Sequence, residues 1–224
     1  MKFVIVGING KMGNAVRSVL YNSEDVLVAG IDIEEDFSKN IYNSVYSIKE
    51  KFDAIIDFST AISRKEIINF CYKNKITYGC FATNVSKDDE MLLKQLSKTN
   101  KVLLCDNASY GVHIMKKIAH LLSTMAVDAD YVLTEYHHKQ KKDAPSGTAK
   151  SLINILNKNN VECSVSSYRV GDEVGTHCLE VFLNNEKLTI THQATNRNVF
   201  AYGAVKLMHK LEQKTCGLYV GVLD

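Results

Sequence analysis

Proline is nearly absent from this chain, since Pro145 is the only one among 224 residues. The sequence also contains no repeat and no low-complexity tract, so nothing in its composition marks a flexible linker. No apolar stretch approaches the length of a membrane span. The run from Met1 to Gly7 is too short in apolar residues for a signal peptide and indicates a first strand instead. We therefore expect a cytoplasmic protein without a membrane segment.

The sequence also has no C-x-x-C cysteine pair and little net charge. The six cysteines are scattered without a C-x-x-C pair, which is typical of reduced, mostly buried thiols and not of a disulfide framework or a zinc site. Lysine and arginine number 27 against 25 acidic residues, a net charge of +2, with no basic stripe among aromatic residues. This balance gives no indication of nucleic-acid binding. The length allows one large domain or two small ones.

A glycine-rich turn follows the first predicted strand, Phe3 to Val6. A predicted helix begins directly at this turn, which has the sequence Gly7-Ile8-Asn9-Gly10-Lys11-Met12-Gly13. Such a turn lets a pyrophosphate approach the backbone and rest on the helix N-terminus, although the glycines alone also suit an ordinary strand-to-helix turn. A second predicted strand, 26–31, ends at Asp32, where a dinucleotide-binding fold carries an acid for the ribose hydroxyls. We expect residues 7–12 and Asp32 to bind NADH or NADPH, with NADH slightly favoured because no arginine follows Asp32.

Strands and helices continue to alternate up to residue 105. Predicted strands lie at 54–58, 76–81 and 101–105, and predicted helices at 62–73 and 86–97. This alternation predicts a Rossmann-like, doubly wound parallel sheet whose ligands bind beyond the carboxyl ends of the strands. Further candidates for dinucleotide contact at those ends are Phe81, Ala82, Thr83, Cys105, Asp106, Asn107 and Ala108.

The pattern changes after Ser109. Two predicted helices, 110–126 and 147–157, accompany a strand leading to His137 and three more strand candidates at 164–170, 178–183 and 188–194. This order predicts a smaller α+β domain with a mixed, open sheet and helices on one face, and an apolar outer face would suit oligomerisation. A helix at 200–211 and an apolar segment at 218–220 would return to the first domain. We expect a dinucleotide-binding domain of residues 1–107 plus 200–224, and a substrate-binding and oligomerisation domain of residues 108–199.

The densest chemistry lies between Glu135 and Thr148. A strand that ends at His137 would let His137 and Lys141 reach the reacting atoms as proton-transfer groups, while His138 holds a substrate group. Gly147 and Thr148 open the following helix, whose N-terminal N–H groups receive a carboxylate or phosphate well. The simpler interpretation is a solvated basic loop. A metal site of His137, His138 and a further His or Cys is disfavoured, because adjacent strand histidines diverge, and we predict no metal.

These residues also carry a family resemblance that runs nearly end to end. The pattern Glu-x-His-His-x-x-Lys-x-Asp-Ala-Pro-Ser-Gly-Thr-Ala, met from Glu135 to Ala149, resembles that of the 4-hydroxy-tetrahydrodipicolinate (dihydrodipicolinate) reductases. The glycine turn, Asp57-Phe58-Ser59, the segment from Arg169 to His177 and Ile190-Thr191-His192-Gln193-Ala194 support it. Phe81-Ala82-Thr83-Asn84 departs from it, standing where the family has Gly-Thr-Thr-Gly.

The resemblance implies a reaction and roles. His137 would donate or accept a proton, Lys141 would donate one, His138 would bind substrate, and Gly147 with Thr148 would hold a substrate carboxylate. Hydride from NADH or NADPH would reduce a cyclic, unsaturated dicarboxylate after water loss, giving tetrahydrodipicolinate in lysine and diaminopimelate synthesis. The family also implies a homotetramer built through the second domain. The alternatives are a catalytically weak or silent dinucleotide-binding or metabolite-binding homologue, and a related reductase of another small dicarboxylate.

Overall fold

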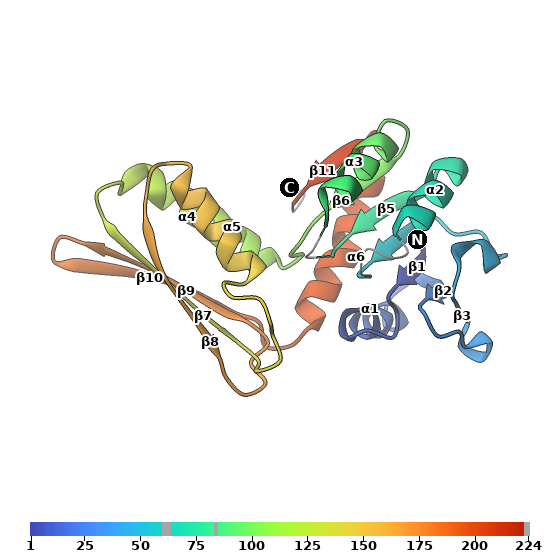
Figure 1. The fold of residues 1–224 in the computed structure, drawn as a ribbon, viewed down its shortest axis with the longest axis horizontal. Helices are drawn as coiled ribbons and strands as arrows, with labels where there is room; N and C mark the ends of the chain where they lie inside the picture. Colours follow the sequence, from blue (N-terminus) through green and yellow to red (C-terminus); the bar gives the residue numbers. More distant parts are fainter. Residues whose placement is uncertain (60–63, 83–84, 222–224) are drawn as a thin grey trace. The chain divides into compact units, whose positions relative to one another are not determined.

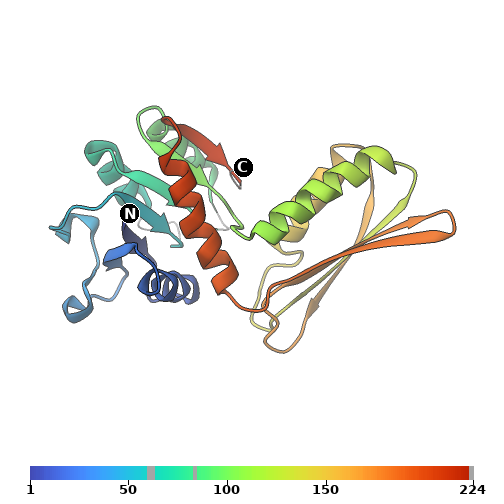
Figure 2. The same cartoon turned by 180° about the vertical axis from the view of Figure 1, so that it is seen from behind.

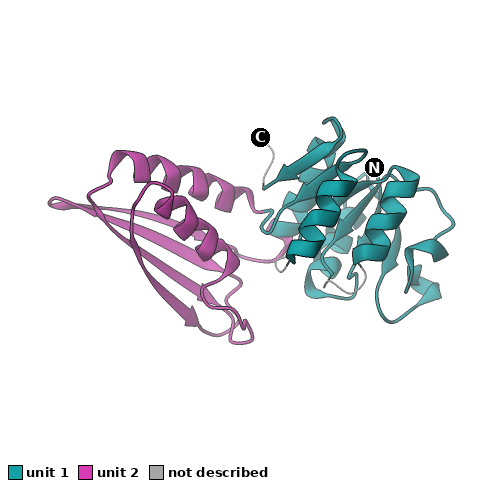
Figure 3. Ribbon diagram, turned by 45° about the horizontal axis from the view of Figure 1, so that its top comes forward, with its two compact units in different colours: residues 1–108, 200–224 teal, residues 109–199 magenta. Residues whose placement is uncertain are grey.

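The structure is a computed structural model that describes residues 1–59, 64–82 and 85–221 (Figure 1). Its chain divides into two compact units, of residues 1–108 plus 200–224 and of residues 109–199 (Figure 3). We call them unit 1 and unit 2. The first division lies one residue later than the boundary that the sequence suggested, after residue 108 and not 107.

Unit 1 contains one seven-stranded sheet in the order β11-β6-β5-β4-β1-β2-β3. Every pairing along it is parallel. The strands are β1 (Lys2–Val6), β2 (Val26–Ile31), β3 (Ile41–Tyr42), β4 (Ala54–Asp57), β5 (Thr77–Cys80), β6 (Lys101–Leu104) and β11 (Gly217–Val220). The apolar segment near the C-terminus does return to unit 1, because β11 pairs with β6.

Helices cover both faces of this sheet. Because successive strand residues point to opposite faces, β1 contributes Phe3 and Ile5 to one apolar cluster and Val4 and Val6 to the other. The first cluster includes residues of α1 (Lys11–Tyr21) and α6 (Asn198–Glu212), and α6 crosses the near face of the sheet in Figure 2. The second includes residues of α2 (Arg64–Asn74) and α3 (Lys87–Leu96). The doubly wound Rossmann-like fold is thus confirmed.

The region between residues 32 and 53 differs from the sequence expectation, and the helix expected at 62–73 lies partly outside the described residues. The region between Asp32 and Asp53, for which the sequence suggested no element, contains the short strand β3 and two 3-10 turns, Phe37–Lys39 and Val45–Ser47. The helix expected at 62–73 is described only from Arg64 onward. No helix in the described ranges combines the length and apolar character that a membrane crossing requires.

Unit 2 is a four-stranded sheet with two helices on one face. The order is β10-β9-β7-β8, in which β7 pairs parallel with β8 and antiparallel with β9, and β9 pairs antiparallel with β10. This is the mixed sheet that the sequence predicted. The elements are α4 (Tyr110–Met125), β7 (Asp130–His137), α5 (Gly147–Asn157), β8 (Cys163–Arg169), β9 (Thr176–Leu183) and β10 (Glu186–Gln193).

The core of unit 2 lies between the sheet and its helices. Met115 of α4 and Leu152 of α5 pack against Leu133 of β7 and Leu179 of β9. Alternate strand residues point to the other face, where the exposed rings of Tyr136 and Tyr168 stack with centroids 5.1 Å apart. Unit 2 therefore has one covered face and one face with exposed aromatic residues.

This core predicts a stability difference between two leucines of the same hairpin. Leu179 is fully buried and Leu188 is 43% exposed. We expect Leu179→Ala to lower the free energy of unfolding by about 2–5 kcal/mol, because it leaves a cavity. Leu188→Ala is the matched control and should change it by less than about 1 kcal/mol. Urea unfolding followed by circular dichroism measures both, and equal losses would contradict the assignment of the core.

Candidate functional site

The glycine turn of unit 1 has the geometry of a phosphate cradle. Gly7 has φ +77, a conformation that favours glycine, and its N–H donates to the carbonyl of Ile31 over 2.8 Å. A Cβ at Gly13 would lie 2.2 Å from the Gly7 carbonyl oxygen, so α1 can approach the turn this closely only with glycine there. Gly10 precedes α1, whose first turn carries no acidic residue. The helix N-terminus is therefore open to an anion.

Asp32 lies beside this turn. One oxygen of its carboxylate accepts a hydrogen bond from the backbone N–H of Asn9 over 2.8 Å, and the other accepts from its neighbour Ile33. Each carboxylate oxygen keeps a lone pair that could accept a ribose hydroxyl. Lys39, a cation close in sequence, pairs with Asp36 over 2.6 Å. The structure thus brings the predicted acid and the predicted turn together.

Phe81 belongs to the core of unit 1. Its side chain is 4% exposed and its ring stacks on Phe58 with centroids 5.4 Å apart. Phe81 and Met208 also fill the space beside Gly79, where an added Cβ would lie 2.4 Å from the Met208 sulfur. Any contact of Phe81 with a dinucleotide would therefore come through its backbone.

The other strand-end candidates differ in accessibility. The Cys105 thiol is buried and donates to the carbonyl of Asn107 over 3.3 Å. Ala108 is also buried, and its carbonyl oxygen approaches Gly203 of α6 so closely that a Cβ there would lie 1.9 Å away. Asp106 is exposed and Ala82 is partly exposed, whereas Thr83 lies outside the described residues.

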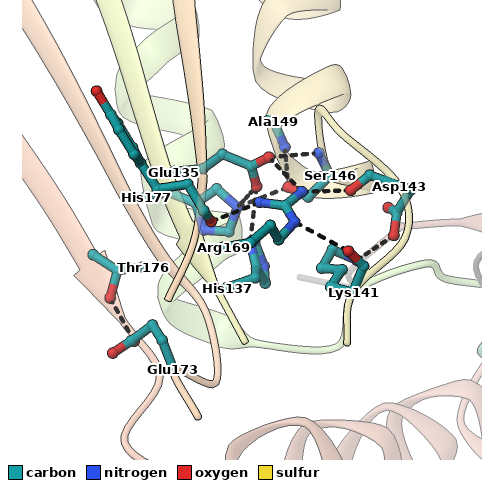
Figure 4. Close-up of polar contacts among 11 residues, drawn as sticks. Glu135, His137, Lys141, Asp143, Ser146, Ala149, Arg169, Glu173, Thr176 and His177 are labelled. Carbon is teal, nitrogen blue, oxygen red and sulfur yellow. Dashed lines mark hydrogen bonds and ion pairs between the residues drawn. The ribbon is translucent and has the colours of Figure 1, made fainter. Parts of the chain in front are cut away.

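His137, one of the two candidate catalytic residues of unit 2, lies beside the buried carboxylate of Glu135 (Figure 4). The Oε1 atom of Glu135 accepts from the backbone N–H of Ser146 over 2.9 Å and lies 3.2 Å from Nη2 of Arg169. Its Oε2 atom lies 2.9 Å from Nδ1 of His137 and 3.8 Å from Nε2 of His177. One carboxylate of β7 therefore contacts groups from β8, β9 and the start of α5.

Ser146 connects this network to α5. Its Oγ accepts from the backbone N–H of Ala149 as the helix cap and lies 3.1 Å from Nε2 of His177. The first turn of α5 contains no acidic residue, and a Cβ added to Gly147 would meet nothing within 4 Å. Thr148 is 8% exposed. The N-terminus of α5 can therefore receive a carboxylate beside Gly147.

Arg169 holds the loop that carries Lys141. Its guanidinium donates to the backbone carbonyls of Lys141, over 3.2 Å from Nε, and of Asp143 from Nη2. The Lys141 amine pairs with the Asp143 carboxylate over 2.8 Å. The strand β7 ends at His137, and the carbonyl of His138 accepts from the backbone N–H of Lys141 over 3.1 Å. His137 and the Lys141 backbone thus belong to one hydrogen-bonded arrangement around Glu135 and Arg169.

The charges in this network stabilise each other. Burial alone would raise the pKa of Glu135, but hydrogen bonds from His137, Ser146 and Ser167 hold it far below its ordinary value. Burial and the neighbouring His137 lower the pKa of His177 to about 3, so His177 is neutral at physiological pH. Glu135 is therefore the fixed negative charge of the site.

Sequence reasoning assigned no role to Glu135, Ser146, Arg169 or His177. One signal for Glu135 was available, because residues i and i+2 of a strand share a face, which places Glu135 with His137. The contacts of Arg169 and His177 depend on sheet register, in which Glu135 is opposite His177 and His137 is opposite Arg169. That register could not be derived from the pattern alone.

Glu135, His137 and His177 also offer three ligand atoms within 4.8 Å of one another, a spacing that suits a metal ion. The predicted alternative had invoked His138 instead. Two features favour a hydrogen-bonded network over a metal here. Arg169 brings a positive charge to the same carboxylate, and His177 Nε2 already contacts Ser146.

Comparisons with known proteins cover both units. The sequence model described as "Dihydrodipicolinate reductase, N-terminus" matches residues 1–108, and the one described as "Dihydrodipicolinate reductase, C-terminus" matches residues 111–222. A 4-hydroxy-tetrahydrodipicolinate reductase of Thermosipho africanus is 33% identical, over 98% of this chain and 95% of its own. That of Wigglesworthia glossinidia brevipalpis is 31% identical, over 98% of this chain and 91% of its own.

Solved structures agree in fold. A dipicolinate-bound dihydrodipicolinate reductase from Paenisporosarcina sp. TG-14 superposes with a TM-score of 0.81 at 21% identity, covering 99% of this chain and 97% of its own. An amine dehydrogenase from Mycobacterium smegmatis superposes with a TM-score of 0.69 at 10% identity, covering 98% and 94%. At these identities the similarity concerns the fold alone.

The buried, neutral His177 predicts how stability depends on pH. The unfolded side chain binds a proton below about pH 6.5, whereas the folded one does so only near pH 3. Between these values the unfolded state holds more protons, so the free energy of unfolding falls as the pH falls, by up to about 1.4 kcal/mol per pH unit.

We expect His177→Gln, which keeps a polar group beside Ser146 but cannot titrate, to reduce this slope between pH 6.5 and 4.5. In that window Glu135 contributes little, because its unfolded pKa of 4.5 lies at the lower edge. Denaturant titrations at several pH values measure the slope. An unchanged slope in the variant would contradict a buried, neutral His177.

Proposed function

The chain belongs to the dihydrodipicolinate reductase family, and on that premise we propose that it converts 4-hydroxy-tetrahydrodipicolinate to tetrahydrodipicolinate with loss of water. Family membership makes the protein an oxidoreductase that uses a nicotinamide dinucleotide and a small-molecule substrate, in lysine and diaminopimelate biosynthesis. The observation that carries the proposed reaction is in unit 2, where proton-transfer side chains precede a helix N-terminus whose first turn contains no acidic residue. His137 and Lys141 come immediately before the open N-terminus of α5 at Gly147.

The glycine turn fits the dinucleotide. Residues 7–12 would hold the pyrophosphate against the N-terminus of α1, where Gly7 presents no side chain and no acidic residue repels the anion. Asp32 would accept hydrogen bonds from the ribose hydroxyls. Ala82, Thr83, Asp106 and Asn107 would lie along the remainder of the cofactor, with the buried Phe81, Cys105 and Ala108 contributing backbone groups. When bound, the reduced nicotinamide supplies hydride.

The substrate is a dicarboxylate and needs positive partners. One carboxylate would rest on the N–H groups of Gly147 and Thr148 at the start of α5. His138 would hold a second polar group of the substrate. Hydride addition to a conjugated imine leaves an electron pair on the substrate that must be protonated, and His137 or Lys141 would supply that proton.

The environment of Asp32 favours NADH. An added ribose phosphate would lie close to this carboxylate, and Lys39, which could have compensated, is paired with Asp36. We expect kcat/KM to be higher with NADH than with NADPH by up to about tenfold, which is about 1.4 kcal/mol. Initial rates with each dinucleotide measure the ratio, and a clear preference for NADPH would contradict this role of Asp32.

The exposed residues of unit 2 and the free cysteines bear on assembly and location. The exposed face of the unit 2 sheet, with Tyr136, Tyr168 and Phe182, suits association between copies, and we propose a homotetramer. Six free cysteines suit the reducing cytoplasm.

The reaction is tested by following NADH absorbance with enzymatically generated substrate. We expect substrate-dependent oxidation of NADH by the purified protein and formation of tetrahydrodipicolinate. We also expect His137→Ala to lower kcat by about 10²–10⁴, because it removes a proton donor, and His138→Ala mainly to raise KM for the substrate.

His120 provides the control for these variants, since it is exposed on α4 outside the proposed site. His120→Ala should retain both parameters. Absence of NADH oxidation in the wild-type protein would overturn the proposed reaction. Equal effects of the His137 and His138 variants on kcat and KM would overturn the division of roles between them.

A further inference from the structure

The two ring nitrogens of His137 have different surroundings within unit 2. Nδ1 lies 2.9 Å from Glu135 Oε2, within ion-pair distance, and neither of these buried atoms has an aligned hydrogen bond to a described residue. Nε2 lies on the side of Gly175, where an added Cβ would be only 3.1 Å away. One nitrogen therefore faces a buried anion, and the other faces a space that exists because residue 175 has no side chain.

The anion that faces Nδ1 is itself held in place. Glu135 is fully buried, and its other oxygen is bound by the Ser146 N–H and by Arg169. Arg169 in turn is fixed by the carbonyls of Tyr168, Lys141 and Asp143. With these contacts on Oε1, the carboxylate cannot rotate away without leaving buried polar groups unpaired, which is costly. Oε2 is thus presented steadily to His137.

We propose that Glu135 and Gly175 are positioning residues for His137, Glu135 holding the Nδ1 proton and Gly175 keeping Nε2 open as the atom that exchanges a proton with the reactant. This assignment rests on the proposed function for the identity of the reactant, but its geometry does not. In the protonation step, the Nε2–H bond of the imidazolium breaks and the proton joins the electron pair left on the substrate by hydride addition. His137 is then neutral, with its remaining proton on Nδ1 facing Glu135.

The charged and titratable groups around the ring allow this assignment. Glu135 of β7 is the negative charge in contact with His137, while His177 of β9 meets its ring edge-on with centroids 5.2 Å apart. Arg169 of β8 is directed to the other oxygen of Glu135, and the Lys141 amine is neutralised by Asp143. His192 of β10 is turned to Ser109. Glu135 is therefore the one acidic group among the described residues that lies within ion-pair distance of Nδ1.

The tautomer of His137 tests the geometry without any substrate. Two-bond ¹H–¹⁵N spectra of the full-length protein with ¹⁵N-labelled histidine distinguish a proton on Nδ1 from one on Nε2, and comparison with His137→Gln assigns the signals. We expect the neutral ring to carry its proton on Nδ1 in the wild-type protein and to show both tautomers in Glu135→Gln, whose amide can donate as well as accept. A wild-type ring with its proton on Nε2 would overturn the proposal.

Turnover tests the function of the two positioning residues. Glu135→Gln should lower kcat by at least about tenfold and alter its pH profile, leaving KM for the dinucleotide unchanged, because unit 1 is untouched. Since this variant also weakens compensation of the buried Arg169, Gly175→Ala provides a second measurement. Its methyl group beside Nε2 should lower kcat by at least about tenfold without changing the Nδ1 tautomer.

Asp172→Ala is the matched control, since it alters an exposed residue of the same connection between β8 and β9 and should retain wild-type kcat. Wild-type kcat in Gly175→Ala would overturn the role of Nε2. A wild-type protein that shows the Nδ1 tautomer but never oxidises NADH would contradict the proposed function while supporting the positioning of the ring. The two failures are therefore distinguishable.

Discussion

A single buried carboxylate organises the candidate site of unit 2. Glu135 has no solvent to stabilise its charge, so it persists only with hydrogen-bond donors and a counter-ion around it. Those partners come from the start of α5, from the end of β8 and from His137 itself. The Glu135 carboxylate thus contacts the start of α5, anchors Arg169, which holds the basic loop, and faces Nδ1 of His137. An apolar residue at this position would have left the three elements without a common partner.

In unit 1, the candidate anion site depends on two positions that have no side chain. The turn after β1 depends on Gly7, with φ +77, and on Gly13, where any Cβ would collide with the Gly7 carbonyl. Both units therefore offer the N-terminus of a helix, α1 or α5, with no acidic residue in its first turn. Under the proposed function, the anionic dinucleotide and the anionic substrate would each meet the N-terminus of a helix.

Much of the fold of unit 1 could be predicted from the local sequence pattern, and the features that could not be predicted have physical causes. The alternation of strands and helices, with Asp32 following the second strand, was sufficient for the Rossmann-like sheet, because sequence neighbours determine strand and helix periodicity. The short β3 escaped notice because two residues are too few for a period. Phe81 follows a strand end, as the sequence indicated, but the direction of its ring could not be predicted, because the ring packs on Phe58, which follows a different strand.

The sequence by itself determined which residues are available to the site, since the stretch from Glu135 to Thr148 places proton-transfer groups just before a helix start. Only the tertiary structure decided how those groups are oriented. The register of β7 with β8 and β9 brings Arg169 and His177 to Glu135, and the return of the chain at Gly175 leaves space beside Nε2 of His137. The reason is that the sequence lists the chemical groups that are present, whereas a buried charge is stabilised by partners from distant segments that only folding brings together.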